Sequence, residues 1–181
     1  ALLTRVLHRG LGPQAAVEAP RWLYGRTWGT ATRALSVEGR YPEELARDLA
    51  RDGEGAKTLI EMEVTGARSR EDARIAARTV VSSPLVKTMV TGRDPNLGRV
   101  MMALGRSGAE VQVERISVWI GGECAFERGA PTELDYKAIS RAMDAPEVKL
   151  KADLGLGEHS ATAWGCDLTA DYVSINADYT T

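Results

Sequence analysis

The chain has 181 residues, 44% of them hydrophobic and 27% charged, which is the composition of a globular protein long enough to bury a core. Its net charge is −2 and basic residues are interleaved with acidic ones, so nothing predicts binding to nucleic acid or to an anionic membrane surface. No apolar run approaches the roughly 20 residues that a membrane-spanning helix needs. Arg5 interrupts the opening stretch ALLTRVL, which therefore does not predict a signal peptide.

Cysteine and histidine usage indicates neither a disulfide framework nor a metal centre. Two cysteines, Cys124 and Cys166, are too few for a secreted disulfide scaffold, and we expect both to be reduced in a cytoplasmic protein. Two histidines, His8 and His159, lie far apart in the sequence and adjoin no candidate nucleophile. We therefore expect no metal site, and no sequence motif indicates a cofactor.

The first 40 residues differ in sequence pattern from the rest of the chain. They hold several Gly and Pro turn signals and two of the four tryptophans, with a short helix predicted over residues 13–19. The rest of this stretch has no regular pattern. We therefore expect an irregular lead-in over residues 1–40 and one main domain over residues 41–181.

From residue 42 onward, the spacing of apolar residues predicts a series of helices and strands. In chain order we expect a helix in 42–53, a strand in 57–66, a helix in 69–83, a strand or extended link in 83–92, a turn and helix in 94–108, a hairpin in 114–131 about Gly121-Gly122, a helix in 133–144, strands in 147–154 and 159–168, and a short helix or strand in 169–181. Helices and strands are mixed without a strict βαβ repeat. This order predicts an α+β fold (mixed α/β), in which helices flank a mixed sheet.

A lone carboxylate between two glycines, Gly53-Glu54-Gly55, is the first candidate functional feature. It stands immediately before the strand predicted in 57–66. One interpretation is a plain turn, in which Gly53 takes the left-handed conformation that ends the helix and Glu54 is solvated. The other is that the glycines leave room for a ligand to reach Glu54.

Two further polar stretches are candidates. In GRDPNLGR, residues 92–99, Asn96 is expected to cap a helix, and the free backbone N–H groups flanked by Arg93 and Arg99 are an alternative anion site. The polar tail INADYTT, residues 175–181, follows apolar residues and either frays or is held down by its tyrosines.

These stretches, in this order, resemble the β chain of ornithine acetyltransferase, also called bifunctional glutamate N-acetyltransferase, over residues 42–181. The resemblance is carried by ARDGEGAKT, SPLVKTMVTGRDPNLGR, ALGRSG and WGCDLTADYVSINADYTT. Two departures are small: the family usually has Trp at the position of Leu97, and usually reads GEGATK where this chain reads GEGAKT.

The resemblance implies a transferase that cuts itself into α and β chains. The new N-terminal Thr of the β chain takes acetyl from N-acetylornithine through an acyl-enzyme and passes it to glutamate, without coenzyme A. An oxyanion hole comes mostly from the α chain. Carried over by motif, the substrate contacts are Glu54, Asn176 and Thr181, the partner is an α chain, and the assembly is α2β2.

The catalytic threonine itself has no counterpart in this chain, so we assign no catalytic residue. Thr4, Thr27, Thr30 and Thr32 match no nucleophile motif. Residues 10–50 show a shorter likeness to the small subunit of γ-glutamyltransferase, which is also a Thr-nucleophile enzyme. The alternatives to acetyl transfer are therefore a γ-glutamyltransferase-like amidohydrolase and a non-catalytic homologue that keeps the substrate pocket.

Overall fold

The computed structural model describes residues 22–24, 35–37 and 43–178. The chain divides into two compact units, Ala1–Ala46 and Arg47–Thr181. Each unit is described by itself below. The second unit contains nearly all of the described residues and carries the candidate site.

A pair of short strands lies in the first unit. Strand β1 (Trp22–Tyr24) runs antiparallel to β2 (Leu35–Val37), with Leu23 opposite Ser36. The irregular lead-in expected for residues 1–40 did not include this pair. The helix predicted over residues 13–19 lies outside the described residues.

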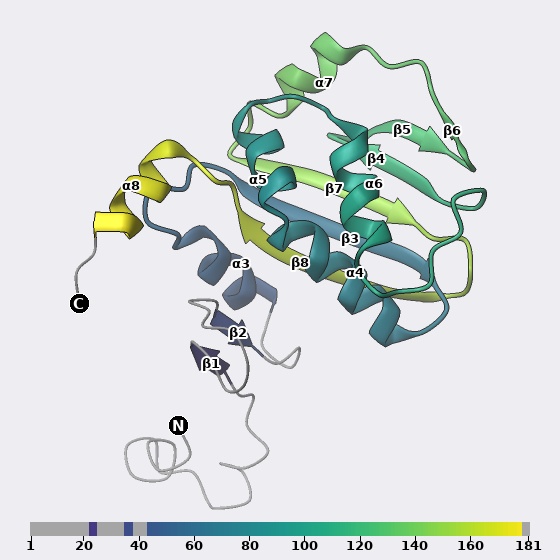
Figure 1. Cartoon of the computed structure of the whole chain (residues 1–181), viewed down its shortest axis with the longest axis horizontal. Coiled ribbons are helices and arrows are strands. Elements are labelled where there is room, and N and C mark those ends of the chain that lie inside the picture. The colour runs from purple at the N-terminus through teal and green to yellow at the C-terminus, as the bar shows by residue number, and fades with distance from the viewer. Residues whose placement is uncertain (1–21, 25–34, 38–42, 179–181) are drawn as a thin grey trace, which may run out of the picture. The chain divides into compact units, whose positions relative to one another are not determined.

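Six strands form one mixed sheet in the second unit, in the order β6-β5-β4-β7-β3-β8 (Figure 1). The strands are β3 (Leu59–Ala67), β4 (Ser117–Ile120), β5 (Glu123–Glu127), β6 (Ala130–Pro131), β7 (Glu147–Asp153) and β8 (His159–Cys166). β3 pairs in parallel with β7, and the other pairings are antiparallel. β3 thus lies between the last two strands of the sheet in chain order.

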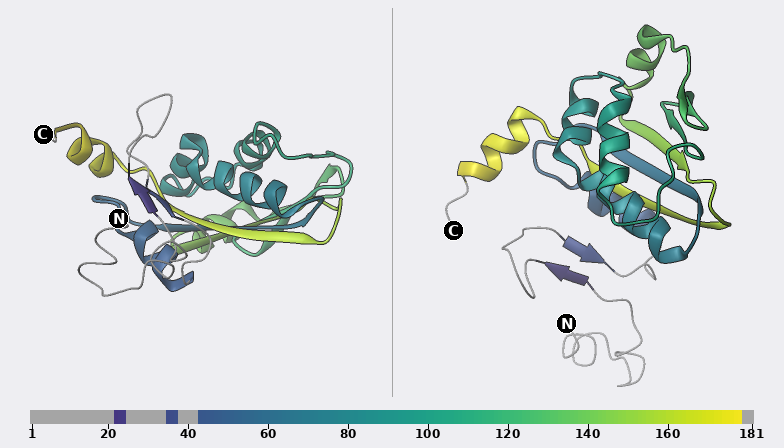
Figure 2. Two further views of the ribbon diagram at one scale, coloured as in Figure 1. Left: turned by 90° about the horizontal axis from the view of Figure 1, so that it is seen from below. Right: turned by 45° about the vertical axis from the view of Figure 1, so that its right-hand side comes forward.

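Helices of the second unit flank this sheet. The helices described are α3 (Glu43–Arg51, which begins in the first unit), α4 (Arg70–Ser82), α5 (Pro84–Thr91), α6 (Leu97–Gly105), α7 (Tyr136–Ala142) and α8 (Ala170–Asp178). Figure 2 shows α4, α5 and α6 together on one face of the sheet, and α8 leading away from the end of β8. The predicted α+β fold, a mixed sheet with flanking helices, is confirmed.

The core lies between the sheet and the helices α4 to α6. Along β3, Ile60, Met62 and Val64 are fully buried, while Glu61 and Glu63 point to the opposite face. Burying each such aliphatic side chain contributes roughly 1.5–3 kcal/mol. The alternation that the sequence showed in this strand is confirmed, and it fixes which face of β3 meets the helices.

Helix α4 supplies the facing apolar surface and begins where the sequence predicted. The Ser69 hydroxyl accepts a hydrogen bond from the backbone N–H of Asp72 at 3.0 Å, which caps the first turn. Ala73, Ala76, Ala77 and Val80 are all fully buried. Their small size lets α4 pack closely on β3 and β8.

The opposite face of β3 is charged. Glu61 accepts hydrogen bonds from the Arg47 guanidinium (2.7 Å) and from the Trp164 indole N–H (2.9 Å), and it lies 3.4 Å from the Lys149 ammonium. Arg47 also pairs with Glu147 on the neighbouring strand. Arg47 thereby links the end of α3 to β3 and β7.

The stretch 83–92 was predicted to be extended, and this prediction is wrong: it forms α5. Pro84 occupies the first turn of this helix, where its fixed φ and missing N–H cost nothing. Val86, Met89 and Val90 are buried at helical spacing, three and four residues apart. Val and Thr give this short stretch a strand-like composition, but burial of one helical stripe against the core outweighs that propensity.

Other local predictions agree with the structure. Asn96 occupies the N-cap position of α6, although its side chain makes no capping hydrogen bond. Gly121 and Gly122, both with positive φ, form the turn between β4 and β5. The stretch 169–181, for which a helix or a strand was open, forms α8 over its described part.

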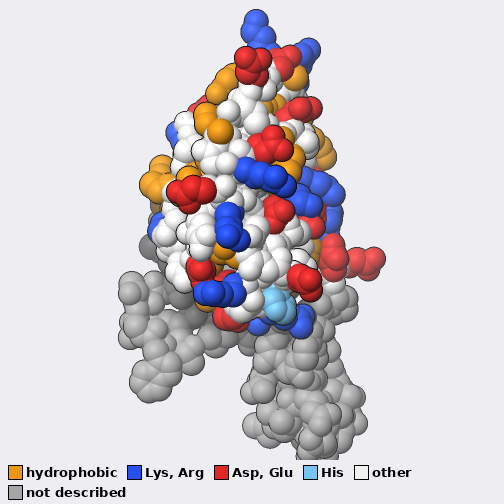
Figure 3. All heavy atoms as spheres, turned by 90° about the vertical axis from the view of Figure 1, so that its right-hand side faces the viewer, with side chains coloured by type: hydrophobic (Ala, Val, Ile, Leu, Met, Phe, Trp, Pro, Cys, Tyr) orange, Lys and Arg blue, Asp and Glu red, His pale blue; other side chains and the backbone are white. Residues whose placement is uncertain are grey.

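The charge pattern expected from the sequence is visible on the surface. On the face seen in Figure 3, Lys and Arg side chains are interleaved with Asp and Glu, and neither sign forms a continuous patch. Among the described residues, no helix combines the length and the apolar character needed to cross a bilayer.

Candidate functional site

A tight turn links α3 to β3 and carries Glu54. The Ala56 N–H donates to the Gly53 carbonyl at 2.9 Å, and Gly55 has φ +83°. A positive φ at the third position is what a type II turn requires, and glycine takes it without strain. The left-handed residue is therefore Gly55, and the interpretation that assigned this conformation to Gly53 is wrong.

Both glycines of the turn face another part of the chain. A Cβ on Gly55 would lie 2.6 Å from the backbone nitrogen of Tyr172, and a Cβ on Gly53 would lie 2.9 Å from the Cys166 Sγ. Real Cβ atoms essentially never come within 3.0 Å of such neighbours. The glycines therefore leave room for the end of β8 and the start of α8, which pack directly on the turn that carries Glu54.

Thr169 joins the turn to the helix. Its hydroxyl donates to the Gly55 carbonyl at 2.6 Å and accepts from the Tyr172 N–H at 2.9 Å. The second contact makes Thr169 the N-cap of α8. Thr169 is buried, so one side chain fixes both the turn and the first turn of the helix.

Asp167 secures the segment between β8 and α8. Its Oδ1 accepts from the backbone N–H groups of Lys57 (2.9 Å) and Thr58 (3.1 Å), and its Oδ2 lies 3.3 Å from the Thr91 hydroxyl. The carboxylate is buried, with Asp167 2% exposed. A buried carboxylate with these partners holds β3, α5 and the segment after β8 together.

The sequence did not single out Asp167 or Thr169, although both lie within the stretch WGCDLTADY that carried the resemblance. The available signal was polar residues just after an apolar strand, followed by a helical stretch with Thr169 at the cap position. The partners Gly55, Lys57 and Thr58, more than 100 residues earlier in the chain, have no local signal.

Glu54 lies at the tip of the turn. Its side chain is exposed and makes no hydrogen bond or ion pair with the described residues. The second predicted contact, Asn176, is in α8, four residues and about one helical turn after Tyr172. The structure therefore brings the turn of Glu54 to the helix of Asn176, while Thr181 lies outside the described residues.

A cavity of about 400 Å³ opens beside the turn and the start of α8. Its walls include charged side chains from α8 and from the segments next to β3, α5 and α7, with Lys57 paired to Asp171 at 3.1 Å and Arg93 paired to Asp144. Asp167 and Thr169 also line it. The lining residue nearest to Glu54 in the sequence is Lys57, three residues later.

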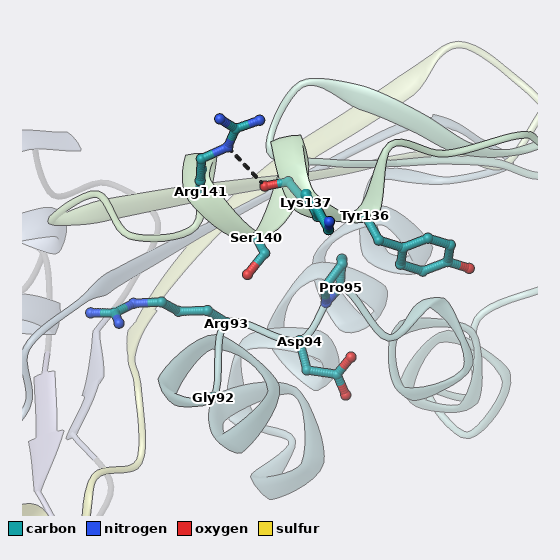
Figure 4. A pocket seen from close by; sticks show the side chains of 8 residues that line it. All are labelled: Gly92, Arg93, Asp94, Pro95, Tyr136, Lys137, Ser140 and Arg141. Atoms are coloured by element: carbon teal, nitrogen blue, oxygen red, sulfur yellow. Dashed lines mark hydrogen bonds between the residues drawn. The ribbon is translucent and has the colours of Figure 1, made fainter.

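The GRDPNLGR stretch lines a second, wider cavity of about 720 Å³ together with α7 (Figure 4). The basic side chains around it point in different directions rather than at one another (Figure 4). Arg93 pairs with Asp144, and Arg99 donates to the Leu85 carbonyl at 3.2 Å. The two arginines are thus engaged within the protein, which argues against an anion site, while Asn96 is the N-cap of α6 by position without a capping hydrogen bond.

The thiol of Cys124 has a raised pKa. Burial raises the pKa of its thiol, and the nearby charge of Glu127 raises this pKa further. Both cysteines are free in the structure. Among the described residues, no group of His, Cys, Asp and Glu side chains is arranged to hold a metal ion.

Comparison with known proteins identifies the family. The sequence pattern of the ArgJ family matches residues 36–181, more than three quarters of the chain. The chain belongs to the ArgJ family. The resemblance drawn from the motifs is confirmed, and the matched region begins a few residues before the predicted start at 42.

Relatives in the ArgJ family are close in sequence. The "Arginine biosynthesis bifunctional protein ArgJ" of Dehalococcoides mccartyi is 50% identical over 139 residues, which are 77% of this chain and 34% of that protein. A "Glutamate N-acetyltransferase" of Methanosarcina mazei is 50% identical over 143 residues, with 76% of this chain and 36% of that protein covered. The chain thus spans about a third of the length of these curated relatives.

A solved structure supports the fold. The crystal structure of the arginine biosynthesis bifunctional protein ArgJ from Bacillus halodurans superposes with a TM-score of 0.73 at 45% identity. The superposition covers 76% of this chain and 65% of the other. The short γ-glutamyltransferase likeness of residues 10–50 stays a prediction, although the ArgJ match already includes residues 36–50.

Proposed function

We propose that this chain forms part of an enzyme of arginine biosynthesis that transfers an acetyl group from N-acetylornithine to glutamate. Relatives named glutamate N-acetyltransferase and bifunctional ArgJ support the reaction class. The observation that carries the proposal is the packing of the Glu54 turn against α8, where Gly55 and Thr169 meet although they are 114 residues apart.

In this proposal Glu54 recognises the side-chain ammonium of the ornithine substrate. An exposed carboxylate on a turn held by Thr169 is available for a charge-assisted hydrogen bond. Asn176 and Thr181 would bind the same substrate from α8 and the segment that follows it. These three roles rest on the motif resemblance, and the geometry of the turn supports the first of them.

The chemical step needs a nucleophile from outside the matched motifs. A threonine supplied from elsewhere in the self-processed enzyme would take the acetyl group of N-acetylornithine as an ester, release ornithine, and pass the acetyl group to the amine of glutamate. No coenzyme A or other cofactor is needed for this exchange. The partners are then an α chain and the two amino-acid substrates, in an α2β2 assembly.

The decisive experiment uses the protein isolated from its source cells with any chain that copurifies. Intact mass spectrometry would show an associated α chain and, after incubation with N-acetylornithine, a chain heavier by one acetyl group. Acetyl exchange to glutamate without coenzyme A is expected. Hydrolysis of γ-glutamyl amides in place of acetyl exchange would favour the amidohydrolase, and substrate binding without either reaction would favour a non-catalytic homologue.

A further inference from the structure

Neither the motif resemblance nor the proposed reaction gives the Thr169 hydroxyl a role. Its O–H donates to the Gly55 carbonyl at 2.6 Å, and its oxygen accepts the Tyr172 N–H at 2.9 Å. A hydroxyl has one hydrogen to donate and lone pairs to accept, so it makes both contacts at once. Thr169 is 5% exposed, so water competes poorly for either partner.

The two groups that Thr169 joins lie on the two halves of the proposed substrate site. Gly55 directly follows Glu54 in the turn, and Tyr172 precedes Asn176 by one turn of α8. The ion pair between Lys57 and Asp171 also links these halves, but both side chains are mostly exposed, 70% and 62%. An exposed ion pair is worth little and is screened by salt.

We propose that Thr169 is a positioning residue, whose hydroxyl sets the distance between the Glu54 turn and the helix of Asn176. This role rests on the proposed function, because it concerns the same substrate. Errors of about 1 Å in the placement of binding groups are costly to enzymes. The two glycines leave no slack in this arrangement, because the turn backbone already touches the backbone of Tyr172.

Two substitutions of Thr169 separate the hydroxyl from the shape of the side chain. Thr169→Val keeps the branched shape but removes the hydroxyl, which leaves the Gly55 carbonyl and the Tyr172 N–H without this partner. Thr169→Ser keeps the hydroxyl and loses a methyl group. Thr88→Val is the control, since the Thr88 hydroxyl is exposed, bonds to the Pro84 carbonyl in its own helix and to the Arg99 guanidinium, and contacts neither the Glu54 turn nor α8 through a hydrogen bond.

The first measurement is amide hydrogen exchange in the whole protein, which needs no substrate. Thr169→Val is expected to speed exchange of the Ala56 and Tyr172 N–H groups about tenfold. The Tyr172 N–H loses its acceptor, and the turn that holds the Ala56 N–H loses the donor to its Gly55 carbonyl. Thr169→Ser and Thr88→Val are expected to exchange these two hydrogens as the wild type does. If Thr169→Val leaves either hydrogen as protected as before, the coupling of turn and helix is disproved.

The second measurement is acetyl transfer and ornithine binding, with the variants made in the native gene. Thr169→Val is expected to raise KM for N-acetylornithine about tenfold and to change kcat less than about threefold, with Thr169→Ser restoring KM. An unchanged KM together with faster exchange would reduce Thr169 to a purely structural residue. If the wild type neither binds ornithine nor transfers acetyl, the proposed function and the positioning role fail together, while hydrogen exchange still decides the coupling itself.

Discussion

Gly55 and Tyr172 are in backbone contact: a Cβ on Gly55 would lie 2.6 Å from the Tyr172 nitrogen. The contact joins the segment before the first strand of the sheet to the helix after the last strand. It explains the glycine better than clearance for a ligand does, because the space beside Gly55 is filled by the protein's own backbone.

Gly55→Ala is therefore expected to destabilise the protein in two ways. A residue with a Cβ at φ +83° costs about 1–2 kcal/mol, and the collision with Tyr172 adds roughly 1–3 kcal/mol. Gly108→Ala is the control, since Gly108 has φ +84° but open space around it. Urea unfolding should show a clearly larger loss for Gly55→Ala, and equal losses would mean that the contact with Tyr172 relaxes freely.

Glu54→Gln tests the proposed substrate contact. The side chain is exposed and unpaired among the described residues, so the free energy of unfolding should change by less than about 0.5 kcal/mol. Loss of a charge-assisted hydrogen bond should raise KM for N-acetylornithine roughly 10- to 100-fold. Glu158→Gln, at another exposed carboxylate, should change neither quantity. A large drop in stability on Glu54→Gln would instead assign the residue a structural role.

Asp167→Ala should lower the free energy of unfolding rather than slow the catalytic step. The substitution leaves the N–H groups of Lys57 and Thr58 without their acceptor, at about 2–4 kcal/mol in the free energy of unfolding. Asp167→Asn retains an oxygen for both N–H groups and should cost less. Chemical denaturation of the two variants gives the comparison, and a larger loss for Asn than for Ala would contradict this account of the carboxylate.

Cys124 should react slowly with thiol reagents. Because burial raises the pKa of this thiol and the thiolate is the reactive form, alkylation of Cys124 near neutral pH should be slower than in the unfolded chain. The folded state favours the neutral thiol of Cys124. The stabilisation from this preference is fully present below the thiol pKa of the unfolded chain, about 8.5, and is lost as pH rises through the raised pKa of the folded state. The alkylation rate of Cys124 can be measured in a Cys166→Ser variant with and without urea. Equal rates in the folded and unfolded chain would refute the predicted slow reaction.

Much of the fold could be predicted from local pattern. The alternation around Met62 fixed the buried face of β3, and Ser69 marked the start of α4. The prediction for residues 83–92 was wrong because their strand-like composition is a local feature, whereas the buried stripe that makes them helical depends on tertiary packing.

The candidate site was only partly predictable, for a different reason. The sequence showed a carboxylate between glycines, but the packing of its turn on the start of α8 depends on pairing between β3 and β8, with Leu59 opposite Cys166. Contacts across more than 100 residues have no signature in either stretch alone. The motif resemblance linked the two stretches, and the bridging role of Thr169 required coordinates.

The position of β3 between β7 and β8 has a consequence for folding during synthesis. Its partners β7 and β8 are made some 90 to 100 residues later, so loop closure must bridge that whole separation before β3 is flanked on both sides. Since the ribosome releases the chain from its amino end, the turn of Glu54 emerges long before its supporting helix exists. The two walls of the proposed substrate site are therefore joined among the last events of folding, and a nascent chain that stalls before residue 169 presents an acidic loop with nothing to hold it in place.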